Sequence, residues 1–349
     1  MKKIVVSGRG ALCNPKNPFD KYEYSEDPLI DLDGDQVKTQ YIINHAKTVI
    51  NKVNSPDVGM DYSLNPYQGC EHGCIYCYAR NTHPYWGYSA GVDFESKIIV
   101  KENAPALLEQ RLKSKKWQAR PIVLSGNTDC YQPAERKYKL TRQMLEIFWK
   151  YRHPVGMITK NSLILRDLDV IEKLASKNLI NVSISLTSLE ESTRRVLEPR
   201  TATAAQRLKA IERLSAVGVP VNVMLAPIIP AINDHEIFKI LEKVASLGAA
   251  TCNYTFIRLN GAVKQLFEEW AEHHFPDRKE KILSHIKAGH GGKVSDSRFK
   301  TRMKGEGKYV ENIRQQFHLA KSKFFPYPSS FAYNWDLYDQ FKHPQLKLF

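Results

Sequence analysis

Three cysteines lie close together in one short stretch of the chain and could bind a single inorganic centre. Cys70, Cys74 and Cys77 are spaced C-x3-C-x2-C, and Gly69 and Gly73 beside them favour close approach of the backbone. Thiolates are soft ligands that select iron–sulfur clusters, zinc or copper(I). A [4Fe–4S] cluster normally takes four cysteines, so three leave one iron open to a substrate or cofactor. The spacing therefore predicts a reactive iron–sulfur centre.

A structural zinc site is the main alternative for the same cysteines. Its fourth ligand would be a histidine, His72 or His83. Structural zinc sites usually combine two pairs of closely spaced ligands. The other cysteines, Cys13, Cys130 and Cys252, are scattered singly and supply no second pair. The arrangement therefore favours the iron–sulfur centre.

The elements that must position these cysteines alternate between short apolar runs and longer amphipathic stretches. Six runs are expected to be strands: residues 63–67, 121–125, 155–159, 180–187, 219–226 and 251–259. Four stretches carry apolar residues at helical spacing: 140–151, 163–177, 203–217 and 234–247. Alternating strands and helices predict an α/β fold with a parallel sheet, and six such units suit an open, partial (β/α)6 barrel. An additional extended segment, 94–100, is expected inside the first crossover.

The chain of 349 residues is predicted to have four parts. They are an irregular lead-in (1–60), in which 40–53 could pair as a strand or form a helix, the barrel (61–260), a helical basic extension (261–342) and a short tail (343–349). No run of about 18 apolar residues predicts a membrane span. The amino-terminal residues lack the long apolar region of a signal peptide. Six cysteines without secretory features indicate a reducing compartment, so we expect a cytoplasmic protein.

The cysteine motif, with Tyr76 directly before its last cysteine, resembles the signature of the radical S-adenosylmethionine (SAM) enzymes. The resemblance implies that a [4Fe–4S] cluster binds SAM through the amino and carboxylate groups of its methionine part. It also implies reductive cleavage of SAM to a 5′-deoxyadenosyl radical, which abstracts hydrogen from a substrate. An electron donor such as a flavodoxin or ferredoxin is then expected. These enzymes have a partial barrel with the cluster loop after the first strand.

Barrel active sites lie at the carboxyl ends of the strands, so side chains near these ends are candidates for binding SAM. The candidates are Tyr76, Asn127, Thr128, Asp129, Lys160, Ser183, Ser185, Leu225 and Ala226. Alternation along the fourth strand puts Ser183, Ser185 and Thr187 on one face, either all inward or all outward. Each candidate also has a structural interpretation: Lys160 could reach solvent, the hydroxyls could bond within a packed lumen, and the apolar pair could be core. The resemblance implies a polar motif after the second strand, where this chain has Gly-Asn-Thr-Asp in place of the common Gly-Gly-Glu.

Four further motifs resemble the spore photoproduct lyase-like branch, often labelled DNA repair photolyases. They are CEHGCIYCYAR, TDCYQPAER, ITKN and LEPRTATAAQRL, and the resemblance covers roughly residues 60–260. True spore photoproduct lyases use a cysteine as a hydrogen donor to a thymine radical. Cys130 lies near the corresponding position and is the candidate catalytic residue. A packed thiol is the alternative for Cys130.

Charge and the chain end both point to nucleic acid as a partner. The formal net charge is +14 and the isoelectric point is near 9.3. Residues 287–308 form a glycine-rich basic stretch suited to phosphate contacts. Gln345–Phe349, QLKLF, resembles the bacterial sliding-clamp-binding pentapeptide, although it could instead pack on its own domain.

The sequence therefore predicts a radical SAM enzyme that acts on damaged or modified nucleic acid. A radical SAM enzyme acting on a protein or small molecule is the first alternative. The second is a non-catalytic nucleic-acid adaptor stapled by zinc.

Overall fold

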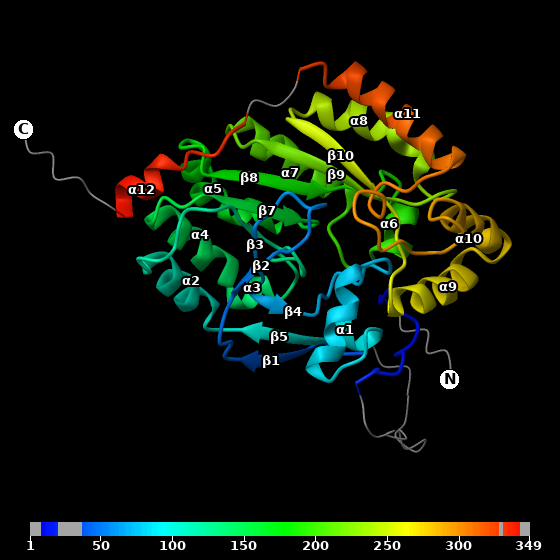
Figure 1. Cartoon of the computed structure of the whole chain (residues 1–349), viewed down its shortest axis with the longest axis horizontal. Coiled ribbons are helices and arrows are strands. Elements are labelled where there is room, and N and C mark those ends of the chain that lie inside the picture. Colours follow the sequence, from blue (N-terminus) through cyan, green and yellow to red (C-terminus); the bar gives the residue numbers. More distant parts are fainter. Residues whose placement is uncertain (1–7, 20–36, 328–330, 343–349) are drawn as a thin grey trace, which may run out of the picture.

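A single twisted sheet carries six parallel strands, and each lies beside the parallel strand that precedes it along the chain (Figure 1). The computed structural model describes residues 8–19, 37–327 and 331–342. The parallel strands are β3 (Tyr62–Leu64), β6 (Ile122–Leu124), β7 (Val155–Thr159), β8 (Ile180–Ser185), β9 (Val221–Ile228) and β10 (Thr251–Phe256). β2 (Ile50–Lys52) pairs antiparallel with β3 at one edge. Within the described residues β10 and β2 do not pair, so the expected open, partial barrel of the α/β class is confirmed.

Helices connect these strands and cover one face of the sheet (Figure 1). They are α2 (Ala104–Lys113), α3 (Glu135–Tyr138), α4 (Leu140–Lys150), α5 (Leu168–Ala175), α6 (Glu191–Leu197), α7 (Ala204–Ala216) and α8 (Ile237–Ser246), with the 3-10 turns η2 (Ser162–Asp167) and η3 (Asp234–Glu236). α7 begins with a capping box, in which Thr203 and Gln206 satisfy each other's backbone amides. Most strand side chains on the helix-covered face are fully buried in one core. The four amphipathic stretches are thus helical as predicted.

The opposite face of the strands lines the lumen of the half-barrel. Ser183, Asn222 and Met224 on this face are half-buried, and they alternate with fully buried residues such as Ile184 and Val223. Asn222 donates to Ser183 Oγ at 3.1 Å, and Asn253 of β10 donates to Asn222 Oδ1 at 2.9 Å. A polar row therefore crosses three strands on the lumen side.

A second, smaller sheet holds the segment around the cysteines. Its order is β1 (Gln40–Asn44), β5 (Lys97–Lys101) and β4 (Tyr67–Gln68). The expected first strand, 63–67, is divided between β3 and β4, which belong to different sheets. The segment expected to be extended from residue 94 begins as the short helix α1 (Val92–Ser96) and becomes extended in β5. The lead-in supplies β1 and β2, so it takes part in both sheets.

The carboxy-terminal elements pack closely on the barrel. They are α9 (Ala262–His274), η4 (Pro276–Arg278), α10 (Lys279–Ala288), α11 (Lys308–Phe324) and α12 (Asp336–Lys342). α11 lies along α8, and the ring of Tyr338 in α12 is fully buried (Figure 1). The hydroxyl of Tyr333 lies 3.2 Å from the position that a Cβ on Gly156 of β7 would occupy. Tyr333 thus closes the lumen near the amino-terminal ends of the strands.

A strap, residues 294–304, joins the two edges of the open sheet. Beyond β10, the Phe256 amide donates to Met303 O and the Leu259 amide donates to Val294 O. On the other side, the Lys300 amide and the Arg302 guanidinium both donate to Asp57, in the hairpin between β2 and β3. The basic stretch predicted to bind phosphate therefore also has a structural role.

No helix among the described residues is long and apolar enough to cross a lipid bilayer.

Candidate active site

The cysteine loop directly follows β4 and is largely buried. The side chains of Cys70 and Cys74 are each 7% exposed, and Cys77 is half-buried. Gly69 and Gly73 have φ values of +78° and +69°, which residues other than glycine rarely adopt. A Cβ on Gly69 would lie 2.9 Å from Lys97 O. The predicted reason for both glycines, close approach of the backbone, is confirmed.

A buried ion pair holds this loop from behind. Arg80 and Glu95 are both fully buried, and Arg80 also donates to the carbonyls of Gly73 and Cys74 at 3.1 and 3.0 Å. Glu95 in turn accepts hydrogen bonds from the amides of Gly10 and Ala11. We call the 70–77 loop with Gly10, Arg80 and Glu95 the cluster cradle. The motif CYAR contained Arg80, but nothing in the sequence pairs it with Glu95.

His72, between two of the cysteines, ties the loop to the ends of β6 and β7. Its Nδ1 lies 3.3 Å from Asp129 Oδ2, and its Nε2 lies 3.1 Å from Asn161 Nδ2. Asp129 also accepts from Thr159 Oγ1 and the Lys160 amide, each at 2.8 Å. Burial acts to raise the pKa of Asp129, but His72 and these donors outweigh it and lower the pKa to about 2. Asp129, expected to contact SAM, thus has its carboxylate occupied by protein donors.

The three thiols suit a polynuclear centre better than a single ion. Burial, Asp129 and the two neighbouring thiols raise the pKa of Cys70 well above its ordinary value, a cost that a positively charged metal centre would relieve. Tetrahedral zinc would bring its sulfur ligands to about 3.8 Å from one another. Among the described residues, one group of three potential ligands lies within 4.8 Å, and it is Glu190, His235 and Glu236. At least one pair of the three thiols is therefore more than 4.8 Å apart, which is wider than tetrahedral zinc requires.

Tyr76 is fixed by a second buried ion pair at the carboxyl end of β8. Its hydroxyl donates to Glu198, which also accepts from Thr187 Oγ1 at 2.6 Å and from Arg207 at 2.5 Å. Burial acts to raise the pKa of Glu198, but the charges of Arg207 and Lys160 outweigh it and lower the pKa to about 2. The motif LEPRTATAAQRL contains both Glu198 and Arg207, but nothing in the sequence indicates that the two side chains pair.

Lys160 lies beside this network with a free ammonium group. Its Nζ is 6.0 Å from the centre of the Tyr76 ring, and within the described residues it makes no hydrogen bond. Burial acts to lower its pKa, but the charges of Cys74 and Glu198 outweigh it and raise the pKa overall. The Lys160 ammonium group is therefore a charged donor next to the cysteine loop that could bind an anionic group.

Asn127 and Thr128, in the turn after β6, are used mainly to build the site. The amides of Asn127 and Thr128 both donate to Asn65 Oδ1, and Thr128 Oγ1 donates to Tyr67 O at 2.7 Å. Thr128 is buried, whereas Asn127 is half-buried and contacts Gln68 and Thr82. Of this pair, Asn127 is the better placed to meet a ligand.

The remaining candidates divide between the lumen and the core. Ser183 is bonded to Asn222, whereas Ser185 has no hydrogen-bond partner for its hydroxyl in the described part of the chain. Leu225 is fully buried in the core, and alternation directs Ala226 to the opposite, lumen face. Ser183 is the more exposed serine, since Ser185 is only 4% exposed, but Ser185 is the one whose hydroxyl is unoccupied among the described residues. Ala226 is the more accessible member of the apolar pair.

Cys130, the candidate hydrogen donor, is fully buried. Its amide donates to Ser125 Oγ, and burial followed by the charge of Asp129 raises the pKa of the thiol well above its ordinary value. It belongs to the core together with Tyr131 and Met144. The structure does not bring this thiol to the lumen.

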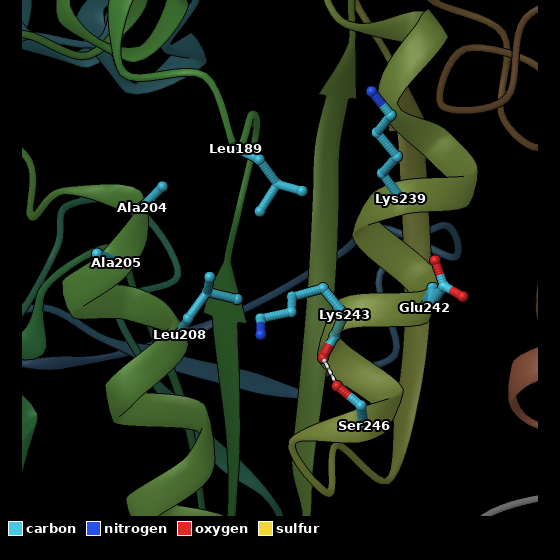
Figure 2. Close-up of a pocket in the computed structure, with 8 residues that line it drawn as sticks. All are labelled: Leu189, Ala204, Ala205, Leu208, Lys239, Glu242, Lys243 and Ser246. Atoms are coloured by element: carbon cyan, nitrogen blue, oxygen red, sulfur yellow. Dashed lines mark hydrogen bonds between the residues drawn. The ribbon is translucent and has the colours of Figure 1, made fainter.

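A surface pocket of about 520 Å³ lies away from all these residues, between α7 and α8 (Figure 2). It has an apolar floor that includes Leu189 and Leu208, and Lys239 and Lys243 extend from α8 beside it. None of the candidate site residues lines it.

Comparison with known proteins supports the chemistry that this geometry favours. An uncharacterized protein of Mycobacterium tuberculosis is 32% identical over 235 residues, 66% of this chain and 69% of its own length. Another, from Methanocaldococcus jannaschii, is 31% identical over 246 residues, covering 70% of this chain and 87% of its own.

Solved structures show the same fold at lower identity. Spore photoproduct lyase complexed with dinucleoside spore photoproduct superposes with a TM-score of 0.60 at 15% identity, covering 82% of this chain and 80% of that one. A variant of the same enzyme with bound AdoMet and the same lesion gives a TM-score of 0.60, covering 84% and 82%. The model of the radical SAM superfamily matches residues 64–244, which include the cysteine loop and strands β3 to β9. The chain belongs to the radical SAM superfamily.

Proposed function

We propose that this enzyme cleaves SAM reductively at a [4Fe–4S] cluster on Cys70, Cys74 and Cys77 and directs the resulting radical at damaged or modified nucleic acid. The observation that carries the proposal is the open lumen beside the three thiols, lined by half-buried polar side chains. Superfamily membership implies both cofactors. The nucleic-acid substrate is supported by the net charge of +14 and by the fold shared with a DNA-lesion enzyme.

When bound, the cluster and SAM supply one electron and a 5′-deoxyadenosyl radical. The chain's own residues bind SAM and orient it. Lys160 offers its ammonium to the carboxylate of SAM, and the Asn127 amide and Ser185 hydroxyl are the polar contacts proposed for its amino and ribose groups. The Tyr76 ring, held by Glu198, and Ala226 form apolar walls for the adenine. Asp129 acts indirectly, because it fixes His72 within the cysteine loop.

The first experiment is an assay for SAM cleavage. The protein is purified without oxygen, reduced with dithionite and supplied with SAM, and 5′-deoxyadenosine is measured by mass spectrometry beside a Cys74→Ala control. Product in the native protein alone supports the proposed chemistry. An intact, reduced cluster that yields no product either alone or with added nucleic acid would contradict it.

The substrate is tested by adding intact and ultraviolet-irradiated oligonucleotides to the same assay. Stimulation of 5′-deoxyadenosine formation by irradiated DNA, together with oligonucleotide binding that weakens steeply with salt, supports a nucleic-acid substrate. Binding that does not respond to salt, without stimulation by any oligonucleotide, would favour a protein or small molecule instead.

A sliding clamp is the proposed protein partner, through Gln345–Phe349. This motif lies outside the described residues, but it follows α12, which lies at the side of the molecule away from α9 and α10 (Figure 1). A partner bound there would leave the carboxyl ends of the strands free. Removal of residues 345–349 should abolish binding to a bacterial clamp in a titration calorimeter. Unchanged binding would eliminate the motif as the contact.

A further inference from the structure

The rim of the lumen is built where five separate segments meet. Tyr78, directly after the last cysteine, donates from its hydroxyl to Gly126 O beyond β6. The strap reaches Asp57 in the β2–β3 hairpin through Arg302 at 2.5 Å. Arg258 lies two residues beyond β10, between the two backbone hydrogen bonds that attach the strap. The cysteine loop and the strap therefore contribute to one opening.

Arg258 is a half-buried guanidinium on this rim without a carboxylate partner in the described part of the chain. Its one hydrogen bond is long, 3.5 Å from Nη1 to the carbonyl of Asp296. The neighbouring acids are already occupied: Asp57 accepts from Lys300 and Arg302, and both oxygens of Asp296 accept from Arg298. Arg298 also pairs with Glu306, so each of these acids already has an arginine partner, and Arg258 is the arginine left without a direct ion pair among the described residues.

The position of Arg258 relates it to the cysteine loop. Asn81, four residues after Cys77, donates to the carbonyl of Asn260 and accepts from the Ala262 amide, each at 2.9 Å, so the segment that carries Arg258 packs beside the end of the cysteine loop. Burial lowers the pKa of Arg258, so the guanidinium has lost part of its hydration. A cation that is partly desolvated attracts an anion more strongly than one in open water.

The strap also carries an exposed aromatic ring. Phe299 on the strap is 51% exposed, and the guanidinium of Arg302 lies over its ring at 4.5 Å from the centre. A cation for a phosphate with an aromatic face for a base is the combination that proteins use for single-stranded nucleic acid. A free phosphate would need the cation but not the ring.

We propose, on the basis of the function proposed above, that Arg258 binds a backbone phosphate of the substrate strand and so fixes the target nucleotide over the cysteine loop. The planar guanidinium suits bidentate phosphate binding, which a lysine does not reproduce. Arg258 is therefore a positioning residue for the substrate, and Phe299 is the surface against which a neighbouring base stacks.

The test measures binding of a fluorescent single-stranded oligonucleotide by anisotropy over a range of salt. Arg258→Gln should weaken binding about 10- to 100-fold and reduce the slope of log K against log salt by about 0.7, the value for one lost phosphate contact on a single strand. Arg258→Lys should recover only part of the affinity. Arg195→Gln is the matched control, because this arginine is 74% exposed and lies 3.8 Å from its one carboxylate partner.

A dinucleotide probe identifies the phosphate itself. A dinucleotide with an ordinary phosphate linkage should distinguish the native protein from Arg258→Gln, whereas its uncharged methylphosphonate analogue should bind both equally. Phe299→Ala should weaken binding of the dinucleotide but should not weaken binding of inorganic phosphate. If inorganic phosphate alone binds through Arg258 as tightly as the dinucleotide does, the site belongs to a small phosphorylated molecule and the inference is wrong.

These measurements distinguish failure of the inference about Arg258 from failure of the proposed nucleic-acid substrate. If Arg258→Gln retains its iron and behaves like Arg195→Gln while the native protein binds the oligonucleotide, the inference alone is overturned. If the native protein itself shows no salt-dependent binding of any oligonucleotide, the nucleic-acid substrate is overturned as well.

Discussion

The cluster cradle and the strap use the same chemistry, an arginine on a carboxylate, in opposite surroundings. In the cradle, Arg80 and Glu95 are fully buried and also bind three backbone segments, at residues 10–11, 73–74 and 90–91. At the strap, Arg298 pairs with Glu306, and their side chains are 58% and 44% exposed. A buried pair that loses one partner leaves an uncompensated charge, whereas an exposed pair is screened by water. The cradle is therefore built to remain fixed, and the strap can adapt.

The largest expected effect is the loss of the cradle through Gly10. A Cβ at this position would lie 1.8 Å from Gly73 O, inside the cysteine loop. Gly10→Ala should therefore displace the loop and abolish retention of iron and sulfide, measured per chain after anaerobic reconstitution. Gly59→Ala is the control, because nothing lies within 4 Å of its added Cβ. Full cluster content in Gly10→Ala would show that the cradle does not constrain the loop.

The next prediction compares the buried arginine–carboxylate pair of the cradle with an exposed pair elsewhere on the molecule. Glu95→Gln leaves the Arg80 charge buried without a counter-ion and should lower the free energy of unfolding by about 3–5 kcal/mol, measured by denaturant titration. Asp61→Asn removes an exposed pair with Arg120, whose side chains are 58% and 51% exposed, and should cost less than about 1 kcal/mol. Equal losses would contradict the distinction between buried and exposed pairs.

Acid should weaken the buried network around Tyr76. The pKa of Glu198 is lowered from 4.5 to about 2 in the folded protein, so the folded state binds its proton less readily than the unfolded state. Its stabilisation is therefore complete above about pH 5 and is lost as the pH falls through 2. The shift corresponds to about 3 kcal/mol. Glu198→Gln should flatten the dependence of unfolding free energy on pH between 5 and 2, and an unchanged slope would contradict this assignment.

The smallest expected effect on global stability is in the strap. Asp57→Asn weakens its attachment to Arg302 and to the Lys300 amide. Hydrogen exchange should become faster at the amides of Phe256 and Leu259, which bond to the strap, while the free energy of unfolding changes far less than in Glu95→Gln. Exchange that stays slow at these amides would mean that the strap is held without Asp57.

The parts of the fold that could be predicted from sequence are those with local causes. Hydrophobic period predicted β7 with its bounds, and the cysteine motif predicted the superfamily. The split of the first strand into β3 and β4 was missed, because one apolar run contains no sign that its halves pair in different sheets. The strap was interpreted as a flexible basic loop, since charge alone does not reveal that Arg302 is paired with a residue 245 positions away.

The candidate site also has a part that could be predicted from the sequence and a part that could not. Residue type and position identified Tyr76 and Lys160 as candidates for binding SAM, and the structure brings these two side chains together. Their partners could not be predicted, because Glu95 contacts Gly10 across 85 positions and Glu198 contacts Tyr76 across 122. Leu225 shows another limit: it was grouped with Ala226 by sequence adjacency, whereas strand alternation puts adjacent residues on opposite faces.

The position of Tyr333 has a consequence for the order in which the protein is made. Synthesis on the ribosome is vectorial, and Tyr333 emerges after every strand of the sheet whose lumen it closes. The nascent barrel therefore passes through a stage in which Cys70, Cys74 and Cys77 have already emerged but Tyr333 has not. A ribosome that stalls late would release a chain with all three cysteines but without the side chain that closes the amino-terminal end of the lumen.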